Sequence, residues 1–192
     1  MKPIVCIALV LSACATTPGA DAPAVKPLTA TDFYPLTVGM KWTYGVEGLS
    51  EKHDIAMLRQ SGVFTEDSEG NRLQVDSYGV RDEKRYLLRN PIEPGTKWSN
   101  VISVSMIEHY VILGTNQPCQ APAGKWENCV VVESRARISA KETLVNEMTF
   151  APGVGLVRVA ITLDGGDRQV PQSVRHLLSF AQPQPPSTTS RP

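Results

Sequence analysis

Apolar and polar residues alternate along several stretches of the chain, which is the pattern of β-strands with one buried face. The alternation is clearest in 41–44, 72–76, 130–138 and 157–163. In the last two stretches, the residues expected to face inward are Val130, Val132, Ser134, Ala136, Ile138, Val157, Val159, Ile161 and Leu163. Their outward neighbours include Glu133, Arg135, Arg137 and Arg158. A buried face beside a charged face predicts antiparallel sheet.

Turn residues separate these stretches. The sequence Asp-Gly-Gly-Asp at 164–167 predicts a hairpin turn, and Glu-Gly-Asn at 69–71 predicts another. The nearly all-apolar run 106–113 suits a central strand. Helical patterns are sparse, because 15 prolines and 14 glycines are spread through the chain, and we expect only a short helical turn near 31–33. The pattern therefore predicts a mainly β protein with little helix.

The N-terminus has the layout of a secretory signal. Lys2 supplies a positive charge, 4–11 form a short apolar run, and small residues follow. This run is far shorter than the ~20 residues that span a bilayer. The segment Leu11-Ser12-Ala13-Cys14 resembles the lipobox of bacterial lipoproteins, in which the cysteine is lipidated and the chain is cut before it. The alternative is an ordinary signal cut near Ala15, with Cys14 incidental.

The lipobox and the composition of the chain together predict four segments. Residues 1–13 are the signal peptide, and 14–31 are the lipidated Cys14 with a flexible tether rich in Ala, Thr and Pro. Residues 32–181 form the β-rich domain, and 182–192 form a disordered Pro/Ser/Thr tail. Ala15 follows the cysteine, which by resemblance favours the outer membrane, with the domain facing the periplasm. The expected membrane contact is therefore the lipid on Cys14.

Charge and composition exclude one class of partner. The chain has 19 Lys and Arg residues and 19 Asp and Glu residues, and its basic residues form no run or patch. Nucleic-acid binding relies on clustered positive charge. We therefore expect no nucleic-acid partner, and no motif implies a cofactor.

Two cysteines remain in the expected domain, Cys119 and Cys129. The segment between them contains a turn-like Gln-Ala-Pro-Ala-Gly at 120–124, which would bring the two flanking segments together. The periplasm permits disulfides. The alternatives are two free thiols, a redox pair or a metal site, although Cys-x-x-Cys spacing and a nearby His cluster are both missing. We favour a structural disulfide.

Three segments, 32–44, 121–129 and 150–158, resemble a group of poorly characterised β-rich envelope lipoproteins. Its members share the motifs YPL-x-VG-x-x-W-x-Y, PAG-x-(aromatic)-x-x-C and APGVGLV. The resemblance implies a single strongly curved antiparallel sheet, broadly similar to the half-barrels of LolA/LolB-like lipoprotein carriers. One departure is Trp126, where the group has Phe. Another is the lack of good candidates for the helices that plug the carriers' sheets, which weakens the implied lipid-carrier function.

Aromatic and titratable residues offer candidate sites. Trp42, Trp98 and Trp126 are expected to pack in the core or at its rim, and ligand stacking is the alternative role. Among the three histidines, His53, His109 and His176, the best acid–base candidate is His109, beside Glu108. A histidine held by hydrogen bonds in or near the core is far more common than a catalytic one, and no catalytic motif is present.

Two acidic turns are candidate Ca²⁺ ligands. The first holds Asp164 and Asp167, and the second holds Asp67, Glu69 and Asn71. Neither supplies the six to eight oxygens that Ca²⁺ takes. Such residues are also common in hairpin turns for backbone reasons, and we favour that role.

The expected function is a membrane-anchored envelope module that binds or assembles without catalysing a reaction. Its partner would be an unknown envelope protein or an apolar ligand. The alternative is a lipid carrier that uses the concave face of the sheet. A third possibility is an envelope hydrolase whose site assembles from distant residues.

Overall fold

We describe the fold from a computed structural model, which describes residues 27–183. The expected signal peptide 1–13, the lipidation site Cys14 and most of the expected tether lie outside the described residues. So does nearly all of the expected C-terminal tail.

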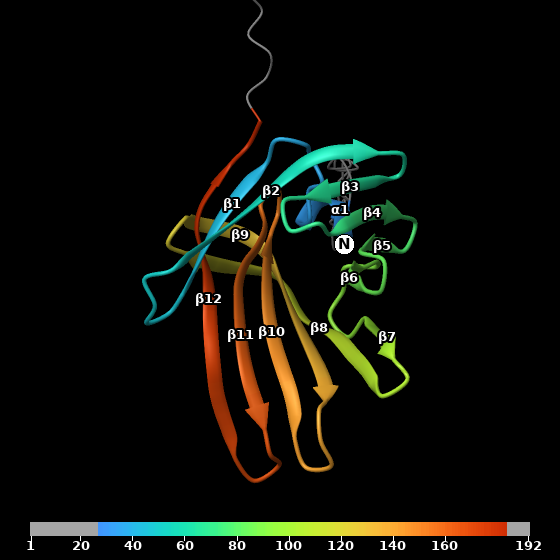
Figure 1. The fold of residues 1–192 in the computed structure, drawn as a ribbon, viewed down its shortest axis with the longest axis vertical. Helices are drawn as coiled ribbons and strands as arrows, with labels where there is room; N and C mark the ends of the chain where they lie inside the picture. Colours follow the sequence, from blue (N-terminus) through green and yellow to red (C-terminus); the bar gives the residue numbers. More distant parts are fainter. Residues whose placement is uncertain (1–26, 184–192) are drawn as a thin grey trace, which may run out of the picture.

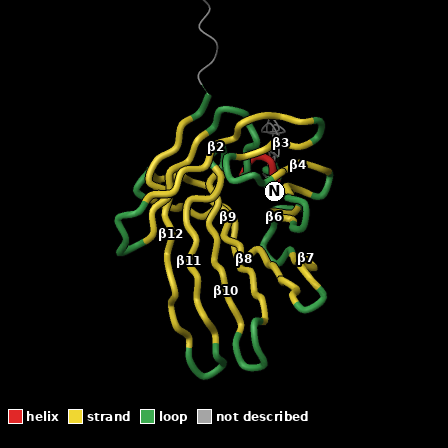
Figure 2. The backbone as a smooth tube through the Cα atoms, viewed as in Figure 1, coloured by secondary structure: helices red, strands yellow, loops and turns green. Residues whose placement is uncertain are grey.

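The described chain contains one short helix, α1, and twelve strands (Figures 1 and 2). The helix is α1 Ala30–Phe33, which confirms the helical turn expected near 31–33. The strands are β1 Lys41–Val46, β2 Lys52–Ser61, β3 Phe64–Asp67, β4 Arg72–Asp76, β5 Gly79–Arg81, β6 Tyr86–Arg89, β7 Lys97–Ser103, β8 Met106–Ala121, β9 Gly124–Arg137, β10 Thr143–Ala151, β11 Gly155–Asp164 and β12 Gln169–Ala181.

The strands form one antiparallel sheet that curves until it is nearly closed into a barrel (Figure 1). Its order is β6-β5-β4-β3-β2-β1-β12-β11-β10-β9-β8-β7. Strands adjacent in sequence are therefore paired, except β6 and β7, which are the two edges. The first and last strands, β1 and β12, pair in the middle of the sheet. This architecture confirms the expected curved antiparallel sheet with little helix.

The two edges of the sheet meet through side chains. The Tyr86 backbone N–H donates to Asn100 Oδ1 at 3.0 Å, and Asn100 Nδ2 donates to the Tyr86 carbonyl at 3.1 Å. Trp98 Nε1 donates to the same carbonyl at 3.0 Å. Arg85 binds Glu108 with two hydrogen bonds, of 2.9 and 3.1 Å. We call this contact the β6–β7 seam. The Asn100 amide side chain bonds to both backbone groups of Tyr86, as the backbone of a neighbouring strand would in a sheet.

The apolar core lies inside the curve of the sheet. One part gathers around Trp42, Met57 and Leu177, and the other around Phe33 and Ile112. Phe33 is fully buried although α1 has only four residues, so this short helix contributes a core side chain. It is held by Asn90 Oδ1, which accepts from the Ala30 N–H at 2.9 Å.

The predicted alternation holds in β9 as far as the strand extends. Val130, Val132, Ser134 and Ala136 are all buried, as expected. The expectation for Ile138 was wrong, because β9 ends at Arg137 and Ile138 is 48% exposed in the following loop.

In β11 the alternation is interrupted by a bulge. The pairing passes from Phe150–Leu156 directly to Thr149–Arg158, so Val157 has no partner of its own. Val157 is fully buried, whereas Val159, Ile161 and Leu163, also expected to face inward, are only half-buried.

The predicted turns are also present. The 164–167 turn joins β11 to β12, and the 69–71 turn joins β3 to β4. Within the run 106–113, residues 108–111 are paired on both sides, by β7 and β9, although β8 is next to the edge of the sheet.

Replacing Asn100 with alanine tests the β6–β7 seam. Asn100 is 4% exposed, and its loss removes the acceptor of the half-buried Tyr86 N–H. We expect the free energy of unfolding to fall by about 2–3 kcal/mol in urea titrations. Ser99→Ala changes the exposed neighbour and should cost less than about 0.5 kcal/mol. Equal effects of the two substitutions would show that the seam has no special role.

Candidate functional site

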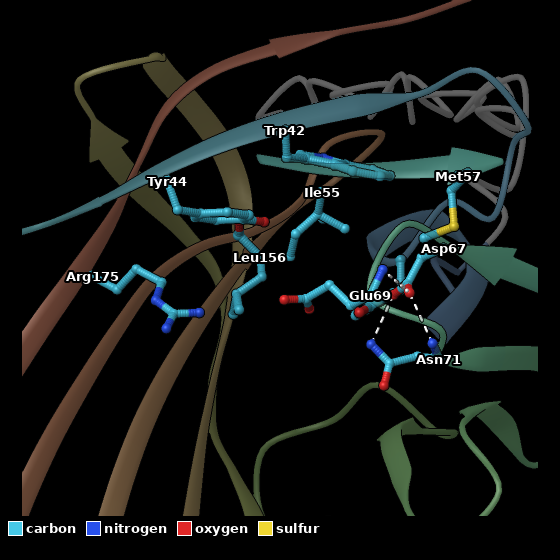
Figure 3. A pocket seen from close by; sticks show the side chains of 11 residues that line it. Trp42, Tyr44, Ile55, Met57, Asp67, Glu69, Asn71, Leu156 and Arg175 are labelled. Atoms are coloured by element: carbon cyan, nitrogen blue, oxygen red, sulfur yellow. Dashed lines mark hydrogen bonds between the residues drawn. The ribbon is translucent and has the colours of Figure 1, made fainter. Parts of the chain in front are cut away.

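A small hollow opens between the first strands and the last strands of the sheet. Its volume is about 100 Å³. Trp42 and Tyr44 from β1 and Ile55 from β2 line one side, while Leu156 from β11 and Arg175 from β12 line the other (Figure 3). A second hollow of about 210 Å³ adjoins it and shares Tyr44 and Arg175. We call the two together the Tyr44 groove.

Two aromatic rings form the apolar roof of the groove (Figure 3). Trp42 Nε1 donates to the Val154 carbonyl at 2.6 Å, and Tyr44 Oη donates to the Leu156 carbonyl at 2.9 Å. Burial raises the pKa of Tyr44, with a smaller contribution from neighbouring groups, so its hydroxyl remains a donor at physiological pH. With their polar atoms held by the backbone, the rings present apolar surface to the groove.

A rigid turn forms the acidic side of the groove. Asp67 is 6% exposed, and its Oδ1 accepts from the backbone N–H groups of Glu69 and Asn71, both at 2.9 Å. Asp67 Oδ2 also accepts from Asn71 Nδ2 at 2.9 Å. The Glu69 carboxylate lies 2.5 Å from His53 Nε2 on β2. The carboxylates of Asp67 and Glu69 are therefore both engaged within the protein.

Among the described residues, Arg175 is the one charged residue of the first hollow, the hollow of about 100 Å³, that has no such partner. It is exposed, and its guanidinium makes no hydrogen bond or ion pair with another residue in the 27–183 range. The pairing of β12 sets it opposite Val46 on one side and Val159 on the other. Figure 3 shows its side chain below Tyr44 and facing the space beside Leu156. A guanidinium in this position can bind a carboxylate or phosphate group in bidentate fashion.

The three tryptophans have different surroundings. Trp42 lines the groove but is only 5% exposed, so only a small part of its ring is open to a ligand there. Trp98 stacks on Tyr110 with ring centroids 5.0 Å apart and is buried in the core. Trp126 is half-buried and packs against Phe180 at 6.3 Å.

The histidines do not gather in one place. His53 lies in the groove, paired with Glu69. His109 contacts the Ser99 hydroxyl at 2.8 Å, while its neighbour Glu108 faces the opposite side of β8 and binds Arg85. His176 pairs with Gly45 and directly follows Arg175 in β12. Adjacent residues of a strand point to opposite faces, so His176 faces away from the side that carries Arg175. His109, the best acid–base candidate in the sequence, is thus separated from Glu108, because the two side chains lie on opposite faces of the sheet.

In both acidic turns, an aspartate carboxylate accepts hydrogen bonds from backbone N–H groups of its own turn. Asp164 accepts from the Gly166 N–H at 3.0 Å and pairs with Arg135 at 2.5 Å. Asp67 organises its own turn in the same way. Among residues 27–183, no group of three His, Cys, Asp or Glu side chains could hold a metal ion.

The structure contains the disulfide between Cys119 and Cys129. It lies within the β8–β9 hairpin, where the register of the two strands shifts. The two cysteines are therefore not direct cross-strand partners: Cys119 pairs with Trp126 and Cys129 with Gln117. Cys129 is fully buried. Nearby, the Ala123 N–H donates to the Leu177 carbonyl at 3.1 Å, which docks the hairpin turn onto β12.

Sequence reasoning missed Arg175. The sequence does contain one signal for it. Arg175 lies two residues before Leu177, which is buried, and side chains two residues apart in a strand point to the same face. A charged residue is therefore placed on the inward face of an expected strand. A bulge between Pro171 and Ser173 shifts this alternation, so counting back from the 164–167 turn does not identify it.

Comparisons with known proteins give limited information. No protein-family model matches the chain, and neither does any curated protein. One similar solved structure is a protein from Bacteroides fragilis, provisionally described as exported and with a YmcC-like fold. It has 14% identity and a TM-score of 0.43, over 78% of this chain and 99% of that one. Another is a provisionally described lipoprotein from Parabacteroides distasonis, with 14% identity and a TM-score of 0.41, over 80% of this chain and 100% of that one. Neither likeness assigns a family, ligand or activity.

Across residues 27–183, no helix has the length and apolar character needed to cross a membrane.

Removing the disulfide should lower stability without changing the fold. The bridge links residues ten positions apart, and closing so short a loop stabilises by roughly 2–3 kcal/mol. The double substitution Cys119→Ser and Cys129→Ser should lower the free energy of unfolding by that amount in urea titrations. Dithiothreitol should destabilise the parent protein and leave the double variant unaffected. Equal sensitivity of both proteins to the reductant would contradict the assignment.

Proposed function

We propose that this chain is a bacterial envelope lipoprotein, anchored by a lipid on Cys14, whose domain binds a small anionic group in the Tyr44 groove without catalysing a reaction. The outer membrane, with the domain facing the periplasm, is the proposed location. The signal layout and the lipobox resemblance of Leu11-Ser12-Ala13-Cys14 support the anchor. The unpaired guanidinium of Arg175 beside an aromatic roof carries the binding proposal.

The groove favours binding over nucleophilic catalysis. The residues that line its two hollows include no serine, threonine or cysteine. The one acid–base pair, His53 with Glu69, therefore has none of these side chains to activate within the groove. The other two histidines lie away from it, which also disfavours the hydrolase alternative.

The concave face of the sheet supports a second candidate, an apolar ligand. Register places Leu144, Ile161 and Leu163 on the face that carries Met148 and Arg175. All four apolar side chains are half-buried. In Figure 1, no other element of the described chain crosses the lower ends of β10, β11 and β12. The hydrocarbon part of an amphiphile could lie along this open face while its anionic head binds Arg175.

Cys14→Ser tests the anchor. The parent protein should remain with the membrane fraction, and its denatured mass should correspond to residues 14–192 plus acyl chains. Cys14→Ser should shift the protein to the soluble fraction, because the acyl chains supply most of the membrane affinity. Cys6→Ser is the matched control, since Cys6 leaves with the signal peptide. An unmodified mass for the parent protein would refute the anchor.

Arg175→Gln tests the groove. Protein purified from its native membrane should carry a small anionic mass that is lost on denaturation. In native mass spectrometry, Arg175→Gln should weaken retention by about ten- to a hundredfold, the effect of losing a charge-assisted bidentate contact worth ~1.5–3 kcal/mol. Arg168→Gln, an exposed arginine of the β11–β12 turn, should leave retention unchanged.

The retained mass also separates the two candidate ligands. A bound species with a long alkyl chain, lost in Ile161→Asn as well as Arg175→Gln, would favour the concave-face alternative. A compact species unaffected by Ile161→Asn would favour the groove by itself. Equal retention by the parent and Arg175→Gln would exclude Arg175 from ligand binding.

A further inference from the structure

The β7–β8 hairpin ends in an uncharged apolar tip. Residues 101–107 read Val-Ile-Ser-Val-Ser-Met-Ile and contain no charged side chain. Val104, in the turn, is fully exposed. Val101 and Ile107 pair across the hairpin and are 69% and 46% exposed. Single exposed apolar residues are ordinary, but several at one tip indicate an interaction surface.

This tip is apolar on both faces of the sheet. Val101 and Ile107 lie on one face, because they form a cross-strand pair. Ile138 follows β9 and is 48% exposed, and continuing the β8–β9 register places it beside Met106 on the opposite face. A protein partner docked on one face would leave the apolar residues of the other face in water. A lipid bilayer surrounds a tip that enters it, so it covers both faces.

The polar groups of the turn are partly satisfied within the hairpin. Ser103 Oγ accepts from the Ser105 N–H at 3.3 Å and lies 3.3 Å from Ser105 Oγ. Backbone and hydroxyl groups that enter a bilayer need internal partners, because hydrocarbon offers none. The turn therefore enters lipid at a lower cost than an open loop would.

The length of chain before the domain allows the tip and the lipid to share one membrane. Pro27 lines a hollow together with Asn116 of β8. From Asn116 to Met106, β8 extends about 33 Å, at ~3.3 Å per residue. The thirteen residue-to-residue steps from Cys14 to Pro27 can span up to about 45 Å. The lipid can therefore reach the level of the tip, which Figure 1 shows at the right side of the molecule, above the β9–β10 and β11–β12 turns that form its lower end.

We propose that the apolar tip, formed by Val101, Val104, Ile107 and Ile138, inserts into the membrane to which Cys14 is anchored. This inference rests on the proposed lipid anchor. A second attachment point would fix the orientation of the domain on the bilayer, which a single lipid attached at Cys14 does not define.

The test supplies the anchor chemically, so it does not depend on native lipidation. The mature chain with its disulfide intact has one free thiol, Cys14, which is coupled to a maleimide lipid in vesicles of phosphatidylethanolamine and phosphatidylglycerol. Hydrogen–deuterium exchange is then compared with that of the uncoupled protein. We expect exchange at residues 101–107 to slow by about tenfold or more in vesicles, because inserted amides lose contact with water.

The β2–β3 turn provides the control. Val63 there is 70% exposed, and exchange at residues 61–64 should not change in vesicles. Val104→Asp should abolish the protection of the tip, whereas Val63→Asp should preserve it. Unchanged exchange at 101–107 in coupled vesicles would overturn the proposal and leave the tip as a contact for a protein partner. Because coupling replaces the native lipid, this failure would be separate from a failure of lipidation at Cys14.

Discussion

The fold depends on closing a single sheet whose two edges are neighbours in sequence. Every strand from β1 to β6, and every strand from β7 to β12, pairs with its chain neighbour, so the chain folds as two meanders. The pairing of β1 with β12 joins the meanders into one sheet, and the Asn100 side chain joins their free edges at Tyr86. An exposed edge is a template for association. Here the buried amide of Asn100, together with the ion pair of Arg85 and Glu108, covers part of both edges.

The same closure places the candidate site. Tyr44 and Arg175 are far apart in sequence, and they share the groove because β1 and β12 are paired. Glu69 lies in the turn after β3, where its backbone N–H donates to the Asp67 carboxylate. The groove therefore depends on the pairing of β1 with β12 and on the turn after β3 that Asp67 caps.

Local features of the fold were predictable from sequence, and non-local ones were not. Alternation identified β9, and the glycine-rich turn at 164–167 identified the last hairpin, because both depend on neighbouring residues. The bulge at Val157 changes which residues share a face, and its position depends on the pairing with β10. The separation of His109 from Glu108 follows from strand geometry, which puts adjacent residues on opposite faces. The partnership of Arg175 with the β1 aromatics required the pairing of the first strand with the last.

The size of the groove limits what it can hold. Its two hollows, of about 100 and 210 Å³, together reach only the lower end of the ~300–1,000 Å³ range of typical small-molecule pockets. A complete lipid therefore cannot be enclosed there. The two faces of the long strands differ as well, because Arg135 with Asp164 and Arg158 with Glu147 form ion pairs on the face opposite Ile161. Any hydrocarbon bound by this domain would therefore lie on the Ile161 face and outside the groove, with only its polar end reaching Arg175.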